Sequence, residues 1–173
     1  MHYRSLVNLY AMKEDYDMPT THSYHAITEW TGAGEGMDPK SFSRDVRLTF
    51  AGRPPVDMSA APEFQGDANR VNPEEMLVGS LSSCQMLTYL FLAARNGIQI
   101  ISYHDNAEGE LSFQSGKMRI VRITLRPTIV VRNDSDLAKA QSLVGRAHSD
   151  CFVANTLACE MPVIATITHE TGE

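Results

Sequence analysis

One stretch, residues 72–97, constrains the fold most, because it predicts a long apolar helix with a cap at each end. Asn72 is a good N-cap, and Pro73 suits the first helical position, where its missing N–H costs nothing. Asn96 and Gly97 supply a left-handed stop. Apolar side chains fall on nearly every face between these caps, which predicts a helix buried on most of its sides. Such a helix fills the concave side of a sheet or the centre of a dimer.

Cys84 lies near the middle of this predicted helix, in an apolar wall. A buried cysteine commonly behaves as a small hydrophobic residue and does no chemistry. The alternative is a thiolate nucleophile whose charge is supported by a neighbouring cation. The helix alone does not decide between the two, so both interpretations stay open at this point.

Charge and composition exclude several classes of protein. The chain has 173 residues, a net charge of −6 and no basic run, which argues against nucleic acid as the main partner. No apolar run is long enough and sufficiently free of charge to predict a bilayer span. The N-terminus lacks both the apolar core and the cleavage site of a signal peptide. We therefore expect a cytoplasmic protein with no membrane partner, organised as an N-terminal arm over residues 1–21 and one domain over residues 22–173.

The spacing of the cysteines and glycines excludes two kinds of site. Cys84, Cys151 and Cys159 are too few for a disulfide framework, and their spacing matches no zinc motif. The last glycine of the glycine-rich residues 32–36 is not directly followed by a Lys-Ser/Thr pair, and no predicted helix opens there, so these residues predict a flexible turn rather than a phosphate-binding loop.

The remaining segments predict an α+β protein. A first hairpin is expected from residues 22–31 and 42–50, and a short third strand at residues 56–59. After the long helix, strands are expected at residues 98–103, 104–113, 118–131 and 163–169. A second helix starts at residues 133–136 and ends near His148, and a helical turn covers residues 152–157. This order predicts antiparallel sheets segregated from the helices.

Three short motifs resemble a known family. They are Asn-Pro-Glu at residues 72–74, Ser-Ser-Cys at residues 82–84 and Cys-Phe-Val-Ala-Asn-Thr-Leu at residues 151–157. In this order, and on these predicted elements, they are similar to the OsmC/Ohr family of osmotically inducible and organic hydroperoxide resistance proteins. The resemblance covers roughly residues 24–168. It implies an OsmC-like fold, with antiparallel sheets packed around a long central helix in an intertwined homodimer.

The resemblance also implies an activity, that of a thiol peroxidase for organic hydroperoxides. Cys84 would be the peroxidatic cysteine, oxidised to a sulfenic acid, and Cys151 the resolving cysteine that condenses with it to a disulfide. An external dithiol, such as a lipoyl group, would then reduce that disulfide. The family mechanism needs no metal and no bound cofactor. The apolar wall of the helix suits a fatty or aromatic hydroperoxide better than a very polar one.

The family site further contains a glutamate and an arginine. Glu74 matches the motif glutamate, and Arg44 is the expected arginine, with Arg47 and Arg53 as alternatives. An arginine near Cys84 would lower the pKa of the thiol, and Glu74 would hold that arginine in a bidentate pair. Ten residues of helix separate Glu74 from Cys84 by roughly 15 Å along the axis and about 80° around it, so the two cannot touch directly.

Several other interpretations remain. On the same scaffold the chain could be a redox sensor without turnover or a small-molecule-binding dimer. Cys84 and Cys151 could be inert core thiols, or a permanent disulfide that constrains the unfolded chain by roughly 4 kcal/mol. Cys159 is expected to be a packing residue. His148 could act as a base near Cys151, although a histidine at a helix end more commonly pairs with a carbonyl.

Overall fold

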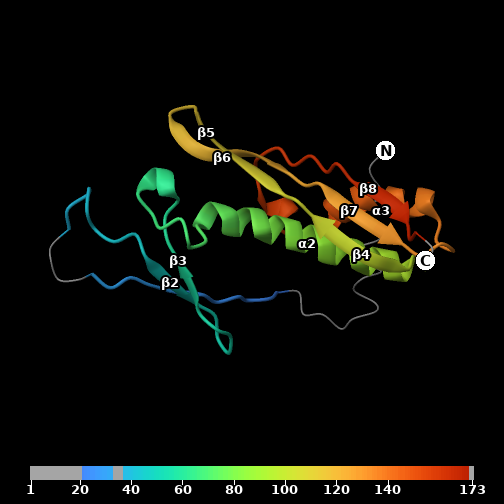
Figure 1. Ribbon diagram of the computed structural model, residues 1–173, viewed down its shortest axis with the longest axis horizontal. Coiled ribbons are helices and arrows are strands. Elements are labelled where there is room, and N and C mark those ends of the chain that lie inside the picture. Colours follow the sequence, from blue (N-terminus) through green and yellow to red (C-terminus); the bar gives the residue numbers. More distant parts are fainter. Residues whose placement is uncertain (1–20, 33–36, 172–173) are drawn as a thin grey trace.

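The computed structural model describes residues 21–32 and 37–171. A long helix, α2 (Pro73–Arg95), runs through the middle of the molecule. A small N-terminal sheet lies beside the start of α2, and a second sheet and a second helix lie along its C-terminal half (Figure 1). The predicted α+β class is confirmed. The N-terminal arm predicted for residues 1–21 lies almost wholly outside the described residues.

The predicted caps of α2 are present. The side chain of Asn72 accepts a hydrogen bond from the backbone N–H of Glu75 at 2.8 Å, and the Glu75 carboxylate accepts one from the Asn72 N–H at 3.0 Å. This reciprocal pair is a capping box, which satisfies two backbone donors that the helix leaves free. Beyond the other end, Gly97 has a φ of +73°, a conformation that glycine adopts at little cost.

A single chain buries only part of the surface of α2 that the sequence predicts to be buried. Buried side chains form one stripe along the helix: Leu81, Gln85, Tyr89, Leu92 and Ala93. Other apolar residues remain accessible, and Leu87 is 63% exposed. The expectation that no segment could span a bilayer also needs correction. Within the described residues α2 is long and apolar enough by length and composition, a test that the core helix of a soluble protein also passes.

The first sheet contains three short antiparallel strands. These are β1 (Ile27–Glu29), β2 (Val46–Thr49) and β3 (Val56–Met58), in the order β1-β2-β3. The predicted hairpin is confirmed, but its strands are shorter than the alternating pattern suggested. The segment that connects β3 to α2 contains a short 3₁₀ helix, η1 (Pro62–Phe64).

The second sheet differs from the prediction in one strand direction. It consists of β4 (Ile100–Asp105), β7 (Pro127–Val131) and β8 (Thr166–His169), in the order β4-β7-β8. β4 is antiparallel to β7, but β8 is parallel to it, so the all-antiparallel expectation is wrong here. The cause is the connection between β7 and β8, which contains α3 (Leu137–Asp150). A crossover of that length lets the chain return in the same direction.

A long hairpin, β5 (Glu108–Gln114) and β6 (Lys117–Thr124), extends from this sheet over the N-terminal half of α2. Its turn places Ser115 and Gly116 at positive φ. The single strand predicted over residues 118–131 is interrupted after Thr124, and Pro127 begins β7. That position suits proline, because the first residue of a strand need not donate to the ladder.

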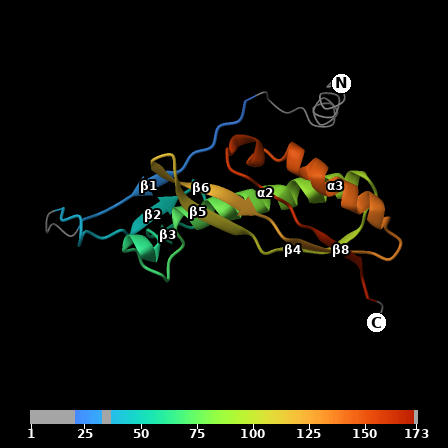
Figure 2. The same ribbon diagram turned by 90° about the horizontal axis from the view of Figure 1, so that it is seen from above.

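Two clusters of buried residues flank α2. The larger one joins its C-terminal half to the second sheet and to α3: Tyr89, Leu92, Ala93, Ile98, Ile129, Val131, Ala140, Leu143, Val144 and Ala147. The smaller one joins the middle of α2 to β6 and to the segment after α3: Leu81, Ile123, Leu125, Cys151 and Ala154. Figure 2 shows α3 alongside α2, with the strands on the other side. The smaller cluster contains Cys151, and Cys84 packs against it.

Candidate active site

The fold brings Cys84 and Cys151 together, although 66 residues separate them in the sequence. Cys84 extends from the middle of α2, and Cys151 is the C-cap of α3. Both pack in the smaller cluster, where Cys84 is partly exposed and Cys151 is fully buried. The contact between α2 and α3 therefore produces a pair of neighbouring thiols, one of which is accessible from outside.

The environment of Cys151 favours the protonated thiol. The pKa of Cys151 is raised to about 11, chiefly by burial and in smaller part by the neighbouring side chain of Cys84, while the backbone N–H of Ala154 acts in the opposite direction. That N–H lies 3.5 Å from the Cys151 sulfur. At neutral pH Cys151 is therefore a neutral thiol held against Cys84, and any role as a nucleophile requires removal of its proton.

All three cysteines are free thiols in the structure. Cys159 also packs against the smaller cluster, where it is partly exposed. Its segment runs along β6, since the N–H of Glu160 bonds the carbonyl of Val121 at 3.1 Å. The predicted packing role of Cys159 agrees with this position.

Glu74 lies in the first turn of α2, nearly three helical turns (about 2.8) before Cys84. Its carboxylate has no hydrogen bond and no ion pair with any described residue. It lines a cavity between the start of α2, η1 and the β5–β6 hairpin. The helical separation from Cys84 is as the sequence predicts, so a third group is needed to connect the two side chains.

The structure places none of the candidate arginines in contact with Glu74 or Cys84. Arg44 donates to the carbonyls of Phe42 and Pro39, the latter at 2.6 Å, and to Gln65 Oε1 at 2.9 Å. Its guanidinium also lies 3.8 Å from the centre of the Phe42 ring. Gln65 directly follows η1, so Arg44 is anchored to the element that forms one wall of the cavity, but it contacts neither Glu74 nor Cys84.

The two alternative arginines lie elsewhere. Arg47 forms a bidentate pair with Asp57 on β3, at 2.7 and 3.1 Å. Arg53 makes only a long contact, 3.5 Å, with the carbonyl of Ala51. Within the part of the chain described here, none of the three candidates supplies a cation to Cys84.

Two buried polar atoms near the thiols have no partner among the described residues: Gln85 Oε1 and His148 Nδ1. Gln85 follows Cys84, and its amide donates to the carbonyl of Val144 at 3.3 Å. His148 lies one turn beyond Val144 and three residues before Cys151. The pairing with a carbonyl expected for His148 is therefore absent at Nδ1. The position of His148 in the sequence indicated it as a candidate base, whereas nothing in the sequence indicated Gln85.

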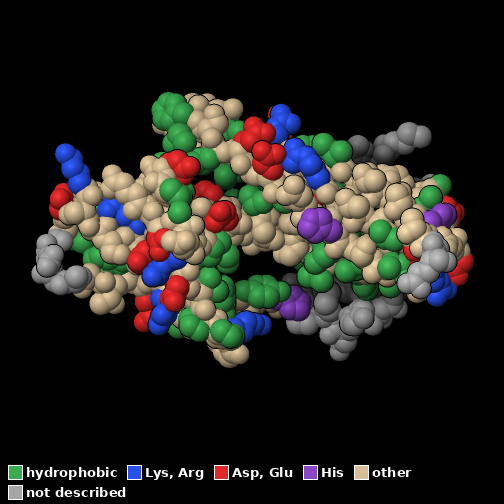
Figure 3. Space-filling model, in the orientation of Figure 1, with side chains coloured by type: hydrophobic (Ala, Val, Ile, Leu, Met, Phe, Trp, Pro, Cys, Tyr) green, Lys and Arg blue, Asp and Glu red, His purple; other side chains and the backbone are tan. Residues whose placement is uncertain are grey.

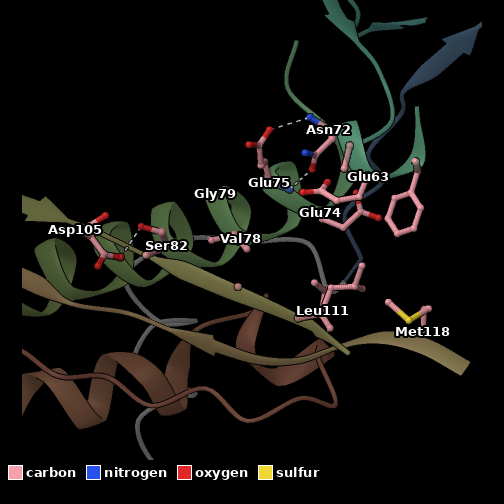
Figure 4. Close-up of a pocket in the computed structure, with 16 residues that line it drawn as sticks. Glu63, Asn72, Glu74, Glu75, Val78, Gly79, Ser82, Asp105, Leu111 and Met118 are labelled. Carbon is pink, nitrogen blue, oxygen red and sulfur yellow. Dashed lines mark hydrogen bonds between the residues drawn. The ribbon is translucent and has the colours of Figure 1, made fainter. Parts of the chain in front are cut away.

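The cavity itself was not predicted. It has a volume of about 860 Å³, and Figure 4 shows the side chains that line it. One wall contains Asp105, whose carboxylate accepts hydrogen bonds from the Ser82 hydroxyl at 2.6 Å and from the Arg126 N–H at 2.7 Å. These residues come from separate elements, and no local sequence motif connects them. No group of three or more His, Cys, Asp or Glu side chains that could hold a metal occurs within the described residues.

Comparison with known proteins identifies the family. The model of the OsmC-like protein family matches residues 66–166, a span that includes α2, both neighbouring thiols and most of the second sheet. A solved OsmC-like protein of unknown function from Vibrio cholerae is 31% identical, with a TM-score of 0.77 over 86% of this chain and 100% of that one. The chain belongs to the OsmC/Ohr family.

More distant relatives share the fold. An organic hydroperoxide resistance protein from Elizabethkingia anophelis is 17% identical, with a TM-score of 0.64 over 88% of this chain and 100% of that one. Among curated sequences, an uncharacterised Bacillus subtilis protein, YmaD, is 24% identical over 79% of this chain and 87% of its own length.

Proposed function

We propose that the protein is a thiol-dependent peroxidase that reduces organic hydroperoxides in the cytoplasm with Cys84 and Cys151. The observation that carries the proposal is the contact between a partly exposed thiol on α2 and a buried thiol at the end of α3. Membership of a family that includes organic hydroperoxide resistance proteins supports it.

The reaction has two chemical steps. The Cys84 thiolate attacks the outer oxygen of the hydroperoxide, and the O–O bond breaks, so that Cys84 becomes a sulfenic acid. The departing alkoxide takes a proton from water and leaves as the alcohol. Cys151 then loses its proton and attacks the Cys84 sulfur, which forms a disulfide and releases water. The two sulfurs are already neighbours, so the second step needs only a small local movement. An external dithiol, such as a lipoyl group, reduces the disulfide, and no metal or bound cofactor takes part.

A second subunit would complete the site. In a single chain α2 leaves apolar residues accessible, and Leu87 on α2, Ile101 on β4 and Ile27 on β1 are each more than half exposed. Such surfaces are typical of an interface. An intertwined homodimer would cover them and could bring the Arg44 of one chain between the Glu74 and Cys84 of the other. That guanidinium would lower the pKa of Cys84 and stabilise charge on the departing oxygen.

The experiment measures hydroperoxide consumption coupled to NADH oxidation through a lipoyl reducing system. The Cys84→Ser variant is expected to lose activity by at least about 10³-fold, because it removes the nucleophile. The Cys151→Ser variant is expected to complete one turnover and stop at a sulfenic acid that dimedone captures. Cys159→Ser is the matched control and retains full activity. Equal loss in the Cys84 and Cys159 variants would contradict the assignment.

One observation favours a second candidate, a redox sensor that does not turn over. Among the described contacts, none of Arg44, Arg47 and Arg53 reaches Cys84, and a sensor needs no arginine to accelerate repeated reaction. In that case one equivalent of peroxide would form the Cys84–Cys151 disulfide, but the reducing system would support no continued NADH oxidation.

A further inference from the structure

Two enclosed polar atoms lie close in sequence to the thiol pair, on the helices that hold it. Gln85 directly follows Cys84 on α2 and is 1% exposed, and His148 precedes Cys151 by three residues on α3. Neither Gln85 Oε1 nor His148 Nδ1 has a hydrogen-bond partner among the described residues. Buried polar atoms in proteins are nearly always hydrogen-bonded, so two such atoms beside a reactive pair are candidates for a role in its chemistry.

Both side chains are anchored at one carbonyl oxygen of α3. The Gln85 amide nitrogen donates to the Val144 carbonyl at 3.3 Å. In an α-helix the same oxygen accepts the N–H of the residue four positions further on, and in α3 that residue is His148. Residues four apart also lie on one face of a helix. The Gln85 amide and the His148 ring therefore meet at the same turn of α3, where it packs on α2.

His148 differs from the histidines at the surface. Figure 3 shows histidine side chains on the outside of the molecule near the second sheet, and His104 of β4 is exposed. Water can bond to the ring nitrogens of such a residue. His148 is only partly exposed, and its Nδ1 is enclosed. That nitrogen therefore faces protein rather than solvent.

The two enclosed atoms become complementary when one proton is added. An amide oxygen only accepts hydrogen bonds, and Nδ1 of a neutral imidazole is an acceptor when the ring hydrogen is on Nε2. Two acceptors do not bond to each other, whereas both nitrogens of an imidazolium are donors. A proton on His148 Nδ1 would therefore provide a donor for Gln85 Oε1 and satisfy both atoms at once.

Cys151 lies beside this pair and has a proton to lose. Its backbone N–H donates to the His148 carbonyl at 3.3 Å. Side chains three residues apart on a helix are neighbours, with about 5–6 Å between their Cβ atoms, so rotation of the two side chains can bring the thiol to the ring. Cys151 is fully buried, and burial raises its pKa to about 11. At neutral pH the thiol therefore needs a base within the protein.

We propose that His148 takes the proton of Cys151 as that sulfur attacks Cys84, and that Gln85 positions the imidazolium that results. The inference rests on the proposed function, because it names the proton acceptor of the second step. The S–H bond of Cys151 breaks, the proton goes to His148 Nδ1, and the new N–H donates to Gln85 Oε1. The S–S bond forms as the S–O bond of the Cys84 sulfenic acid breaks. The hydroxide that leaves takes the proton from His148 and departs as water, which restores the neutral ring.

The first test needs no peroxide, because a mixed disulfide can replace the sulfenic acid. In a Cys159→Ser background, dithiobis(nitrobenzoate) reacts with the partly exposed Cys84 and releases one coloured thiolate. Attack by Cys151 on the mixed disulfide then releases a second. His148→Ala is expected to slow the second release at least about tenfold, as loss of a general base does, and to change the first less than about twofold. Absence of a second release in the wild type overturns the proposal, because the two thiols then do not exchange.

A matched control and a chemical rescue distinguish proton transfer from a structural role. His169→Ala is the control, since His169 is also partly exposed but its Nε2 lies 2.9 Å from the Ser135 carbonyl, at the other end of α3. It should leave both releases unchanged. Free imidazole is expected to accelerate the second release of His148→Ala in proportion to its concentration, an effect that the loss of a packing side chain would not produce.

Two further variants test each partner. His148→Gln keeps a hydrogen-bonding side chain that takes no proton, so its second release should be as slow as that of His148→Ala, and it replaces that variant if alanine prevents folding. Gln85→Leu should slow the second release about threefold, the loss typical of one hydrogen bond. A wild-type rate in Gln85→Leu overturns the positioning role of Gln85. A wild-type rate in His148→Gln, or no acceleration of His148→Ala by imidazole, overturns the role of His148.

The reaction with hydroperoxide separates failure of this inference from failure of the proposed function. Rapid quenching and mass spectrometry distinguish the Cys84 sulfenic acid from the disulfide with Cys151. In His148→Ala the sulfenic acid should form at the wild-type rate, and the disulfide at least about tenfold more slowly. If peroxide oxidises no Cys84 while the second release still depends on His148, the peroxidase assignment fails and the proton transfer stands. If both His148 variants form the disulfide at the wild-type rate, the proton transfer is wrong and the peroxidase assignment stands.

Discussion

The two halves of α2 differ in what surrounds them. The C-terminal half places Tyr89, Leu92 and Ala93 in the larger cluster, against the second sheet and α3. The N-terminal half faces a cavity, and its first two turns contribute no fully buried side chain. Cys84 lies where the two halves meet. One helix thus anchors the fold at its C-terminal end and borders a cavity at its N-terminal end, with Cys84 between the two.

The largest expected effect on stability comes from the C-terminal half of α2, which is packed in the larger cluster. Leu92 is 3% exposed, and Leu92→Ala is expected to lower the free energy of unfolding by about 3 kcal/mol, through lost burial and a cavity that neighbours cannot fill. Leu87→Ala is the matched control, since Leu87 is 63% exposed in the single chain. In a dimer its effect should appear only as a changed concentration dependence of the denaturation midpoint. Equal, concentration-independent losses would show that the two faces do not differ as described.

The next largest effect is on catalysis, and it concerns the arginine that the dimer proposal places between Glu74 and Cys84. Under the dimer proposal, Arg44→Ala is expected to lower kcat/KM by about 100-fold, the loss typical of one group that stabilises transition-state charge. Arg47→Ala removes a surface pair with Asp57 and should change kcat/KM less than threefold. Stopped-flow oxidation of Cys84 by cumene hydroperoxide measures the step directly. If Arg47→Ala has the larger effect, the choice of arginine is wrong.

The sequence predicted the part of this arrangement that local patterns determine. The caps of α2, the second helix and the first hairpin follow from residues close together in the chain, and family motifs indicated the cysteine pair. The cavity, its four carboxylates and the unpartnered Gln85 Oε1 arise from packing between distant segments, which no local pattern encodes. The single chain leaves one face of α2 accessible, because the sequence shows which residues are apolar but not which chain covers them.

A third prediction uses the thiol pair as a probe of pH. The pKa of Cys151 is raised to about 11 in the folded protein, whereas an ordinary thiol titrates near about 8.5. Between these values the unfolded chain has lost the proton and the folded chain retains it, so stability falls as pH rises. The contribution is complete below about pH 8.5 and is lost as pH passes through 11. Urea denaturation of wild type and Cys151→Ala over pH 8 to 11 measures the difference. The Cys151→Ala variant should lack this fall in unfolding free energy. Wild type and variant stabilities that change in parallel with pH would contradict the prediction.

The smallest expected effect tests whether the open end of α2 depends on its cap. Asn72→Ala removes one of the two hydrogen bonds of the capping box and should cost about 1 kcal/mol. Asp136→Ala is the matched control, because the Asp136 carboxylate caps α3 through the Lys139 N–H at 3.0 Å. The two variants should lose similar amounts of unfolding free energy.

The effects should differ in where the structure opens. Buried residues lie along α3, so the Asp136 variant should destabilise the domain as a whole. The first turn of α2 has little packing to retain it, so Asn72→Ala should also accelerate hydrogen exchange of the amides near Glu74. If exchange there is unchanged while global stability falls, the first turn is held by contacts other than its cap.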